Sequence, residues 1–429
     1  MIKNIFPQDQ VFWYLNKPFC KPLTKPLIVD VVVVGGGMTG LSAAQSFHKK
    51  GLSVVLLEKN FCGAGASGKS SGFITPDSEY SLHNLLNVYG PDQGTNLWNF
   101  AVSGVNTIKN NIKKYNLDCD YQPQDTLVIA TSDATFKNQI TPEHEARLKL
   151  HFKSTLYPKE KLPTVIGSTN YYGGVRYADT FGISAYRYCQ EMKKVLQNEG
   201  VHIYEETPVT AITTQGVTTP HASVITDRVV VCIDRFLPEL GKLTHEVYHV
   251  QTFLMMSAPL SNEQIAKIFP ETNMMVWDTD LIYNYFRVTG DNRLMLGGAQ
   301  LLSTYAQQEH HNNQAIVKKL TTYFKKTFPT LPIEFAYIWP GLLGITKDII
   351  PIAGPDIDLP HVYYISGAAG LPWATALGVY SAENMLENRH DLDDVFSPQR
   401  HFTLGAGIQK ILGTKLTFAL SNFMLTRSL

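Results

Sequence analysis

Three glycines at fixed spacing, followed by one acid, form the most informative pattern in this chain. Gly35, Gly37 and Gly40 occupy the constant places of Gly-x-Gly-x-x-Gly, directly after the apolar run 31–34. The three glycines allow, in turn, a tight bend, close approach of the backbone to a pyrophosphate, and close packing of helix on strand. Glu58 ends the next apolar run, where a carboxylate accepts hydrogen bonds from an adenosine ribose and disfavours the extra phosphate of NADP. The pattern therefore predicts a dinucleotide site at the N-terminus of a helix.

A second glycine-rich segment follows Glu58 and reads Gly63-Ala-Gly-Ala-Ser-Gly-Lys-Ser-Ser-Gly72. Ser67 and the glycines beside it offer hydroxyl and backbone N–H donors to a phosphate group. The small residues after Ser67 would let the backbone lie against a flat ring. We therefore expect this segment to contact the same ligand as the first glycine pattern.

The sequence His245-Glu-Val-Tyr-His249 matches a zinc-protease motif, but we predict no metal there. That motif requires a helix, which puts both histidines on one face. The residues that follow His249 are strand formers, and four residues of strand span roughly 13 Å, too far for one zinc ion. His310 and His311 are expected on a solvated surface.

The composition excludes several classes of function. The chain has 429 residues, enough for two cores, and a formal net charge of zero, which argues against a nucleic-acid partner. Its five cysteines are scattered and include no Cys-x-x-Cys pair, which favours a reduced, cytoplasmic protein. The N-terminal segment lacks the apolar stretch of a signal peptide. No run reaches the roughly eighteen apolar residues of a membrane span.

The order of strand and helix patterns predicts the fold. Short apolar runs at 201–204, 229–233 and 362–366 suit the same sheet as 31–34, whereas 247–256, 281–288 and 293–296 look like antiparallel strands. We therefore predict an α/β plus α+β fold, in which a Rossmann-like domain is interrupted by a mixed-sheet substrate domain. The Rossmann-like domain would comprise residues 1–80, 173–245 and 340–400, and the substrate domain residues 81–172 and 246–339.

Residues 401–429 form a separate, basic tail. Beyond Asp394 the chain contains no Asp or Glu, and apolar residues between Leu404 and Met424 recur mostly at helical spacing. Two interpretations stay open: an amphipathic helix lying on a membrane surface, or a terminal helix docked on the protein. Glycines at 405, 407 and 413 weaken such a helix.

Several blocks of sequence resemble the D-amino-acid oxidase-like superfamily of FAD-dependent oxidoreductases, most closely its γ-glutamylputrescine oxidoreductase branch. They occur in the order of the family and span nearly the whole chain. The blocks are the segment 63–72, Gly173-Gly-Val-Arg, Leu237-Pro-Glu-Leu-Gly241, Tyr285-Phe-Arg-Val-Thr, Arg293-Leu-Met-Leu-Gly-Gly298, Trp339-x-Gly341, Thr346-x-Asp348-x-x-Pro351 and Gly367-Ala-Ala-Gly370.

The resemblance implies FAD as the cofactor, so the Rossmann-like domain would be the FAD-binding domain. It implies non-covalent binding, because no cysteine lies where some members bond the flavin. The helix that follows Gly370 would stabilise negative charge on the reduced ring. The residues that it assigns to the cofactor are Gly35, Gly37, Met38, Thr39, Gly40, Glu58, Lys59, Ser67, Lys69, Ser70, Ser71, Gly72, Val209, Gly341, Gly367, Gly370 and Leu371.

The chain also departs from the family. Met295 stands where the sarcosine-oxidase branch has a lysine that helps oxygen react, and Phe73 and Pro372 stand where that branch holds a substrate carboxylate with basic residues. An amine is therefore a more natural substrate than a simple α-amino acid. We expect substrate contacts from Phe73 and from Tyr283, Tyr285 and Arg287, which alternate along one strand and could share a face.

These observations predict oxidation of the C–N bond of an amine, with polyamine derivatives among the candidates, by hydride transfer to flavin N5. Oxygen or a quinone would accept the electrons, and the tail offers a route to peripheral membrane contact. The sequence identifies no catalytic base. Two alternatives stay open: an amino-acid or 2-hydroxy-acid dehydrogenase that reduces a quinone, and a flavoprotein with a mainly binding or assembly role.

Overall fold

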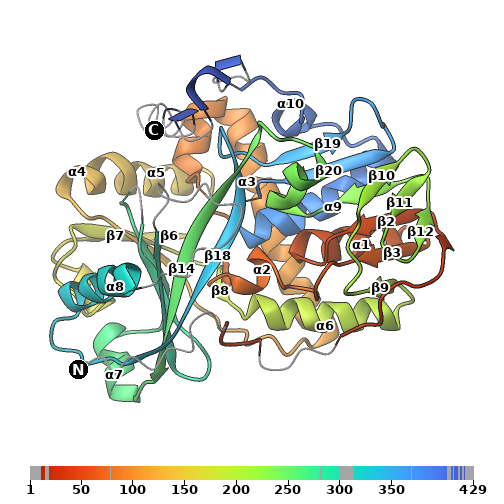
Figure 1. Ribbon diagram of the computed structural model, residues 1–429. Helices are drawn as coiled ribbons and strands as arrows, with labels where there is room; N and C mark the ends of the chain where they lie inside the picture. Colours follow the sequence, from red (N-terminus) through yellow and green to blue (C-terminus); the bar gives the residue numbers. More distant parts are fainter. Residues whose placement is uncertain are drawn as a thin grey trace.

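The computed structural model describes residues 11–14, 19–77, 79–280, 283–299, 314–368, 370–402, 407–408, 410–413, 416–417 and 420. Two large sheets lie side by side in Figure 1, and the long strands β14 and β18 run between the two halves of the molecule. The sequence predicted this two-part α/β and α+β architecture, and the prediction is confirmed.

The first large sheet contains the apolar runs that the sequence assigned to it. Its strand order is β19-β20-β13-β2-β3-β9. All neighbours are parallel except β19 and β20. The strands are β2 (Val31–Val34), β3 (Val54–Leu57), β9 (His202–Tyr204), β13 (Val229–Val231), β19 (Ile352–Pro355) and β20 (Val362–Ser366).

Successive side chains of β2 point to opposite faces of this sheet, and apolar residues cover both faces. Val31 and Val33 pack with helical residues on one face, whereas Val32 and Val34 pack toward a small sheet on the other. The helices are α1 (Met38–Lys49), α6 (Ala185–Asn198) and α9 (Leu371–Glu387). The small sheet has the order β1-β12-β11-β10, with β1 (Leu27–Ile28), β10 (Ala211–Thr213), β11 (Gly216–Thr218) and β12 (Ser223–Ile225).

The second large sheet has eight strands in the order β18-β14-β17-β16-β15-β5-β7-β6. Helices α7 (Asn262–Ile268) and α8 (Gln314–Thr327) cover one face of it, and the opposite face of its central strands turns toward the first half. The strands are β5 (Thr126–Ile129), β6 (Ser154–Pro158), β7 (Gly173–Tyr177), β14 (Val247–Pro259), β15 (Met275–Asp278), β16 (Tyr285–Val288), β17 (Arg293–Ala299) and β18 (Phe335–Thr346).

Shorter elements connect the two halves. Helix α3 (Leu82–Tyr115) bends at Gly90, which has a φ of +78° and precedes Pro91. The two-stranded sheet of β4 (Phe73–Ile74) and β8 (Phe181–Gly182) lies where the halves meet. The remaining elements are α2 (Ala66–Lys69), α4 (Asp133–Thr135), η1 (Phe136–Ile140), α5 (Thr141–Lys149), η2 (Leu162–Thr164), η3 (Asp234–Leu240) and α10 (Asp393–Phe396).

The domain boundaries differ from those predicted at residues 81, 173 and 340. Strand β7 begins at Gly173 but belongs to the second sheet, and β18 continues in that sheet to Thr346. Helix α3 packs against α9, as the contact between Phe100 and Trp373 shows. Periodicity predicts the apolar stripe of α3, but not which partner covers it.

The tail interpretation falls largely outside the described residues, which include neither Leu404 nor Met424. Of the positions that are described there, Ile411 and Leu416 have exposed side chains. In the described part of the chain, every helix is too short or too polar to cross a membrane.

Candidate active site

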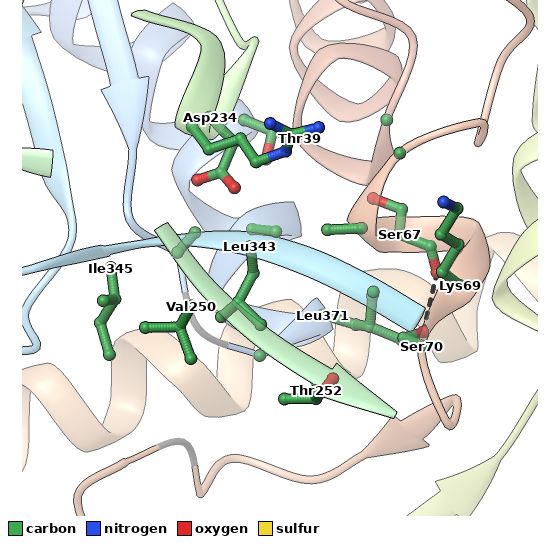
Figure 2. Close-up of a pocket in the computed structure, with 18 of the residues that line it drawn as sticks. Thr39, Ser67, Lys69, Ser70, Asp234, Val250, Thr252, Leu343, Ile345 and Leu371 are labelled. Atoms are coloured by element: carbon green, nitrogen blue, oxygen red, sulfur yellow. Dashed lines mark hydrogen bonds between the residues drawn. The ribbon is translucent and has the colours of Figure 1, made fainter. Parts of the chain in front are cut away.

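A cavity of about 1260 Å³ extends from the glycine turn after β2 to the face of the second sheet. In Figure 2, side chains of β14 and β18 such as Thr252 and Leu343 lie on one side of it, across from Ser67 and Lys69. Pockets for a single small ligand reach about 1,000 Å³. This cavity therefore has room for a dinucleotide and for a second small molecule.

The glycine turn has the geometry that the sequence predicted. Gly35 has a φ of +106°, and a Cβ on Gly40 would lie 1.9 Å from the carbonyl oxygen of Gly35. A Cβ on Gly37 would lie 3.0 Å from Ser67 Oγ, and that hydroxyl accepts a hydrogen bond of 3.1 Å from Met38 N. Helix α1 therefore begins at the cavity wall without space for side chains, which favours an anion there.

Glu58 is held by the backbone around the turn. Its Oε2 accepts a hydrogen bond from Gly36 N at 2.7 Å, and its Oε1 accepts one from Asn60 N at 2.8 Å. Burial raises the pKa of Glu58, while these two hydrogen bonds and the nearby Lys59 act in the opposite direction. Both oxygens keep a further lone pair, so the fixed carboxylate can still accept hydrogen bonds from a ligand hydroxyl.

Residues 63–72, called here the phosphate loop, are fastened by aromatic side chains from elsewhere in the chain. Trp13 Nε1 donates a hydrogen bond to Gly68 O at 2.5 Å, and Trp339 Nε1 donates one to Lys69 O at 3.0 Å. Tyr14 donates to Gly63 O at 3.0 Å. The sequence did not predict this role for Trp13 and Tyr14, because nothing local links them to the loop.

Arg287 supports the end of the phosphate loop from beneath. Its Nε donates to Ser71 O at 2.7 Å and its Nη2 donates to Ile183 O at 2.6 Å. The side chain has no exposed surface, and burial lowers the pKa of its guanidinium to about 10. The predicted substrate contact is therefore corrected: Arg287 does not line the cavity, because the loop backbone covers it.

The role of Asp234 was not predicted from the sequence. This residue follows β13 with a φ of +49°, and its Oδ2 accepts a hydrogen bond from Gly344 N at 2.6 Å. Its Oδ1 accepts one from Gly367 N at 3.0 Å. Asp234 also lines the cavity (Figure 2), so one carboxylate joins the ends of β13 and β20 to β18. An acid at the end of a predicted strand was the available signal.

Most of the residues predicted to bind the cofactor line this one cavity. Met38, Gly40 and Gly367 do not, because they pack beneath its surface and shape the turns. The predicted residues that line it are Gly35, Gly37, Thr39, Glu58, Lys59, Ser67, Lys69, Ser70, Ser71, Gly72, Val209, Gly341, Gly370 and Leu371.

Four aromatic residues form a continuous wall at the other end of the cavity. The Phe73 ring centroid lies 5.9 Å from that of Trp277 and 5.8 Å from that of Tyr285. Tyr285 lies 5.9 Å from Tyr283 by the same measure. Gly297 makes room for this wall, since a Cβ there would lie 2.1 Å from the Tyr285 ring.

The same end of the cavity is rich in carboxylates, most of which have partners. Asp77 and Glu143 both form ion pairs with Arg147, at 2.9 Å and 2.6 Å. Asp278 accepts hydrogen bonds of 3.1 Å from the backbone and side chain of Asn284, and burial raises its pKa to about 6.

Glu79 has fewer partners than Asp77, Glu143 or Asp278. Its Oε1 accepts a hydrogen bond of 3.1 Å from Tyr283, and no Lys, Arg or His pairs with it in the described part of the chain. Burial raises the pKa of Glu79. The basic residues among those that line the cavity are Lys59, Lys69 and Arg235, all beside the glycine turn or the phosphate loop.

The zinc-protease motif does not form a metal centre. Val247 begins strand β14, so His245 and His249 do not share a helix face, and His249 Nε2 lies 2.9 Å from Arg235 O. Across the described residues, no group of His, Cys, Asp or Glu could hold a metal ion. His310 and His311 lie outside those residues.

A glycine-rich cradle between a Rossmann-like sheet and a mixed sheet is the arrangement of a dinucleotide-binding protein. The chain belongs to the DAO family of FAD-dependent oxidoreductases, whose family model matches residues 30–383. The resemblance inferred from the sequence blocks is thereby confirmed.

Two relatives and two solved structures agree with this assignment. The chain is 28% identical over 357 residues to the gamma-glutamylputrescine oxidoreductase of Escherichia coli, covering 81% of each chain. It is 28% identical over 360 residues to a probable oxidoreductase, OrdL, of Haemophilus influenzae, covering 81% of this chain and 80% of that protein.

Two solved structures share the fold. The structure of glycine oxidase from Geobacillus kaustophilus matches this one with a TM-score of 0.74 at 18% identity, covering 88% of this chain and 100% of that one. L-proline dehydrogenase from P. horikoshii also has a TM-score of 0.74 at 18% identity, covering 87% and 97%.

The residues present fit FAD. The cradle at Gly37 and Gly40 excludes any side chain, and Glu58 is oriented for a ribose. The phosphate loop and Gly341 border the space between the cradle and the aromatic wall. A flavin held there would lie between the adenine end and the second molecule.

Proposed function

We propose that this protein is an FAD-dependent amine oxidoreductase. One observation supports this most: the described residues that line the cavity end at Phe73 and Trp277 include carboxylates and aromatic rings, but no Lys, Arg or His. A cationic or neutral amine matches that surface, whereas the carboxylate of an amino acid or a hydroxy acid would meet like charge. Phe73 occupies a place where a related branch holds a substrate carboxylate with a basic residue.

Bound FAD would accept a hydride from the carbon next to the amine nitrogen, leaving an imine that water hydrolyses. The protein orients the substrate and excludes water from this step. Tyr283, Tyr285 and Phe73 would position the amine, and the phosphate loop would hold the cofactor against them. Helix α9, which begins at Leu371, points its N-terminus toward the cavity and would stabilise a reduced, anionic ring.

The names of relatives are compatible with amines and with amino acids. The similarity to gamma-glutamylputrescine oxidoreductase favours an amine, and polyamine derivatives remain the leading candidates. The chain is also 23% identical over 401 residues to a D-amino acid dehydrogenase of Helicobacter pylori, which keeps the acid-oxidising alternative open. The third alternative, a flavoprotein with a binding or assembly role, predicts no rapid reduction by either class.

Anaerobic mixing of the purified holoenzyme with amines and with amino or hydroxy acids tests the proposal. Amines should bleach the oxidised flavin band within seconds, and the acids should not. Bleaching by acids alone would overturn the proposal in favour of the dehydrogenase, and bleaching by neither class would favour the binding role.

A further inference from the structure

Resting on the proposed function, we propose that Glu79 and the aromatic wall form a subsite for a second, protonated nitrogen of the substrate. The substrate class would then be an alkyl diamine, whose reacting nitrogen is neutral and whose remote nitrogen is an ammonium group. This inference rests on the position of Glu79, which has no cationic partner among the described residues, beside four aromatic rings at one cavity end.

Like Asp278, Glu79 has no cationic partner among the described residues, but a single hydrogen bond, from Tyr283, reaches Glu79. Arg147 neutralises Asp77 and Glu143, and Glu143 also accepts hydrogen bonds from the backbone N–H groups that open helix α3, such as His83 N at 2.7 Å. Asp278 is fixed by Asn284. Asp280 has an exposed side chain, so water compensates its charge. An ammonium group beside Glu79 would supply the missing opposite charge.

The aromatic wall suits the methylene groups and the charge of the same ligand. The Tyr283 hydroxyl donates a hydrogen bond to Glu79, and the Tyr283 ring packs against Tyr285, which in turn packs against Phe73. Ring faces attract an ammonium group that lies within about 6 Å of their centroids. The alkyl chain between the two nitrogens would lie against the rings of Phe73 and Trp277.

The arrangement also favours a different protonation state for each of the two nitrogens of the diamine. Hydride transfer requires a lone pair on the nitrogen next to the reacting carbon, so the nitrogen at the flavin must be neutral. The carboxylate of Glu79 instead stabilises the protonated form of the remote nitrogen. A monoamine of equal length would lack that contact and would bind more weakly.

The test compares N-methyl-1,4-diaminobutane with N-methylpentylamine, two secondary amines of matched length, in anaerobic stopped-flow reduction of the holoenzyme. We expect the apparent Kd of the diamine to be at least about tenfold lower than that of the monoamine, because only the diamine forms a charged hydrogen bond with Glu79. Glu79→Gln should remove this preference, so that the two amines have nearly equal apparent Kd values. Equal Kd values for both amines, or a preference that survives in Glu79→Gln, would overturn the inference while the proposed function stands.

Two controls separate a direct contact from other effects. Asp280→Asn removes an exposed charge at the same end and should change the preference by less than about threefold; a loss equal to that of Glu79→Gln would show long-range attraction instead. Pentyltrimethylammonium has no lone pair and cannot be oxidised. Binding of this cation is followed by the change that it causes in the flavin spectrum, and half of that change should require at least about tenfold more cation in Glu79→Gln than in the wild type. Equal binding by the wild type and by Glu79→Gln would contradict the subsite. Reduction by acids alone would instead refute the proposed function.

Discussion

Arg287 and Ser71 lie 216 positions apart in the sequence, yet Arg287 Nε donates a hydrogen bond of 2.7 Å to the carbonyl oxygen of Ser71. Arg287 belongs to β16 of the second sheet, and Ser71 belongs to the phosphate loop that follows the first sheet's β3. The contact therefore connects the substrate side of the cavity directly to the cofactor side.

Arg287→Met should destabilise the protein and loosen the loop. The carbonyl oxygens of Ser71, which is partly buried, and of Ile183, which is buried, would lose charged donors, and hydrogen bonds to charged groups contribute about 1.5–3 kcal/mol each. We expect a loss of roughly 3 kcal/mol in the free energy of unfolding, with weaker flavin retention. Urea unfolding measures the first and gel filtration of the holoenzyme the second. Arg176→Met, at a partly exposed ion pair on β7, is the control and should cost about 1 kcal/mol or less.

Gly37→Val should abolish flavin retention. Even a Cβ at this position lies 3.0 Å from Ser67 Oγ, and the branched side chain would fill the space against the N-terminus of α1. The wild-type protein should purify yellow and release free FAD on acid precipitation, whereas the variant should be colourless. Lys49→Ala, at the exposed end of the same helix, should remain yellow. A yellow Gly37→Val protein would contradict the assignment of this turn to the cofactor.

Glu58→Ala should weaken FAD binding by at least about tenfold, because the ribose would lose its acceptor and Gly36 N its partner. Fluorescence titration of the apoprotein with FAD gives the dissociation constant. The exposed Glu263→Ala on α7 serves as the control. An unchanged dissociation constant in Glu58→Ala would place the adenosine elsewhere.

Asp356 should make stability depend on acid pH. Its burial raises the pKa, but hydrogen bonds from Lys242 and Tyr364 and from two backbone N–H groups outweigh burial and lower the pKa to about 2. The unfolded value is near 3.8, so the stabilisation is complete above that pH and is lost as the pH falls through about 2. The stability difference between the wild type and Asp356→Asn, from urea unfolding, should therefore be larger at about pH 5 than at about pH 2.5. A difference that does not change with pH would refute this assignment.

Reoxidation by oxygen should be slow. By the resemblance, Met295 stands where the sarcosine-oxidase branch has an oxygen-activating lysine. Its side chain is fully buried among Met256, Trp339 and Val11, where it offers no charge to the cavity. Reduced enzyme mixed with aerated buffer should turn over more slowly than with a soluble quinone. Reoxidation by oxygen at the rate of substrate turnover would defeat this prediction and the proposed quinone route through the tail.

Local patterns predicted the parts of the site that local sequence determines. The glycine turn, the acid at Glu58 and the parallel strands follow from residue spacing within single segments. The role of Arg287 could not be predicted, because strand alternation places it on the same face as Tyr285 but does not reveal that the phosphate loop covers it. Asp234 and Trp13 act through hydrogen bonds between segments that are distant in the sequence, and no pattern of residue spacing within one segment predicts such contacts.

The strand order of the first sheet also constrains when the cofactor can be captured during biosynthesis. Strand β2 lies beside β13, and β13 lies beside β20, so three adjacent strands are translated at widely separated times. Strand β20 and the start of α9, which border one wall of the cradle, are translated long after β2. A complete cradle therefore needs both the segment around β2 and the segment 362–371, so a chain truncated before Val362 is expected not to retain flavin.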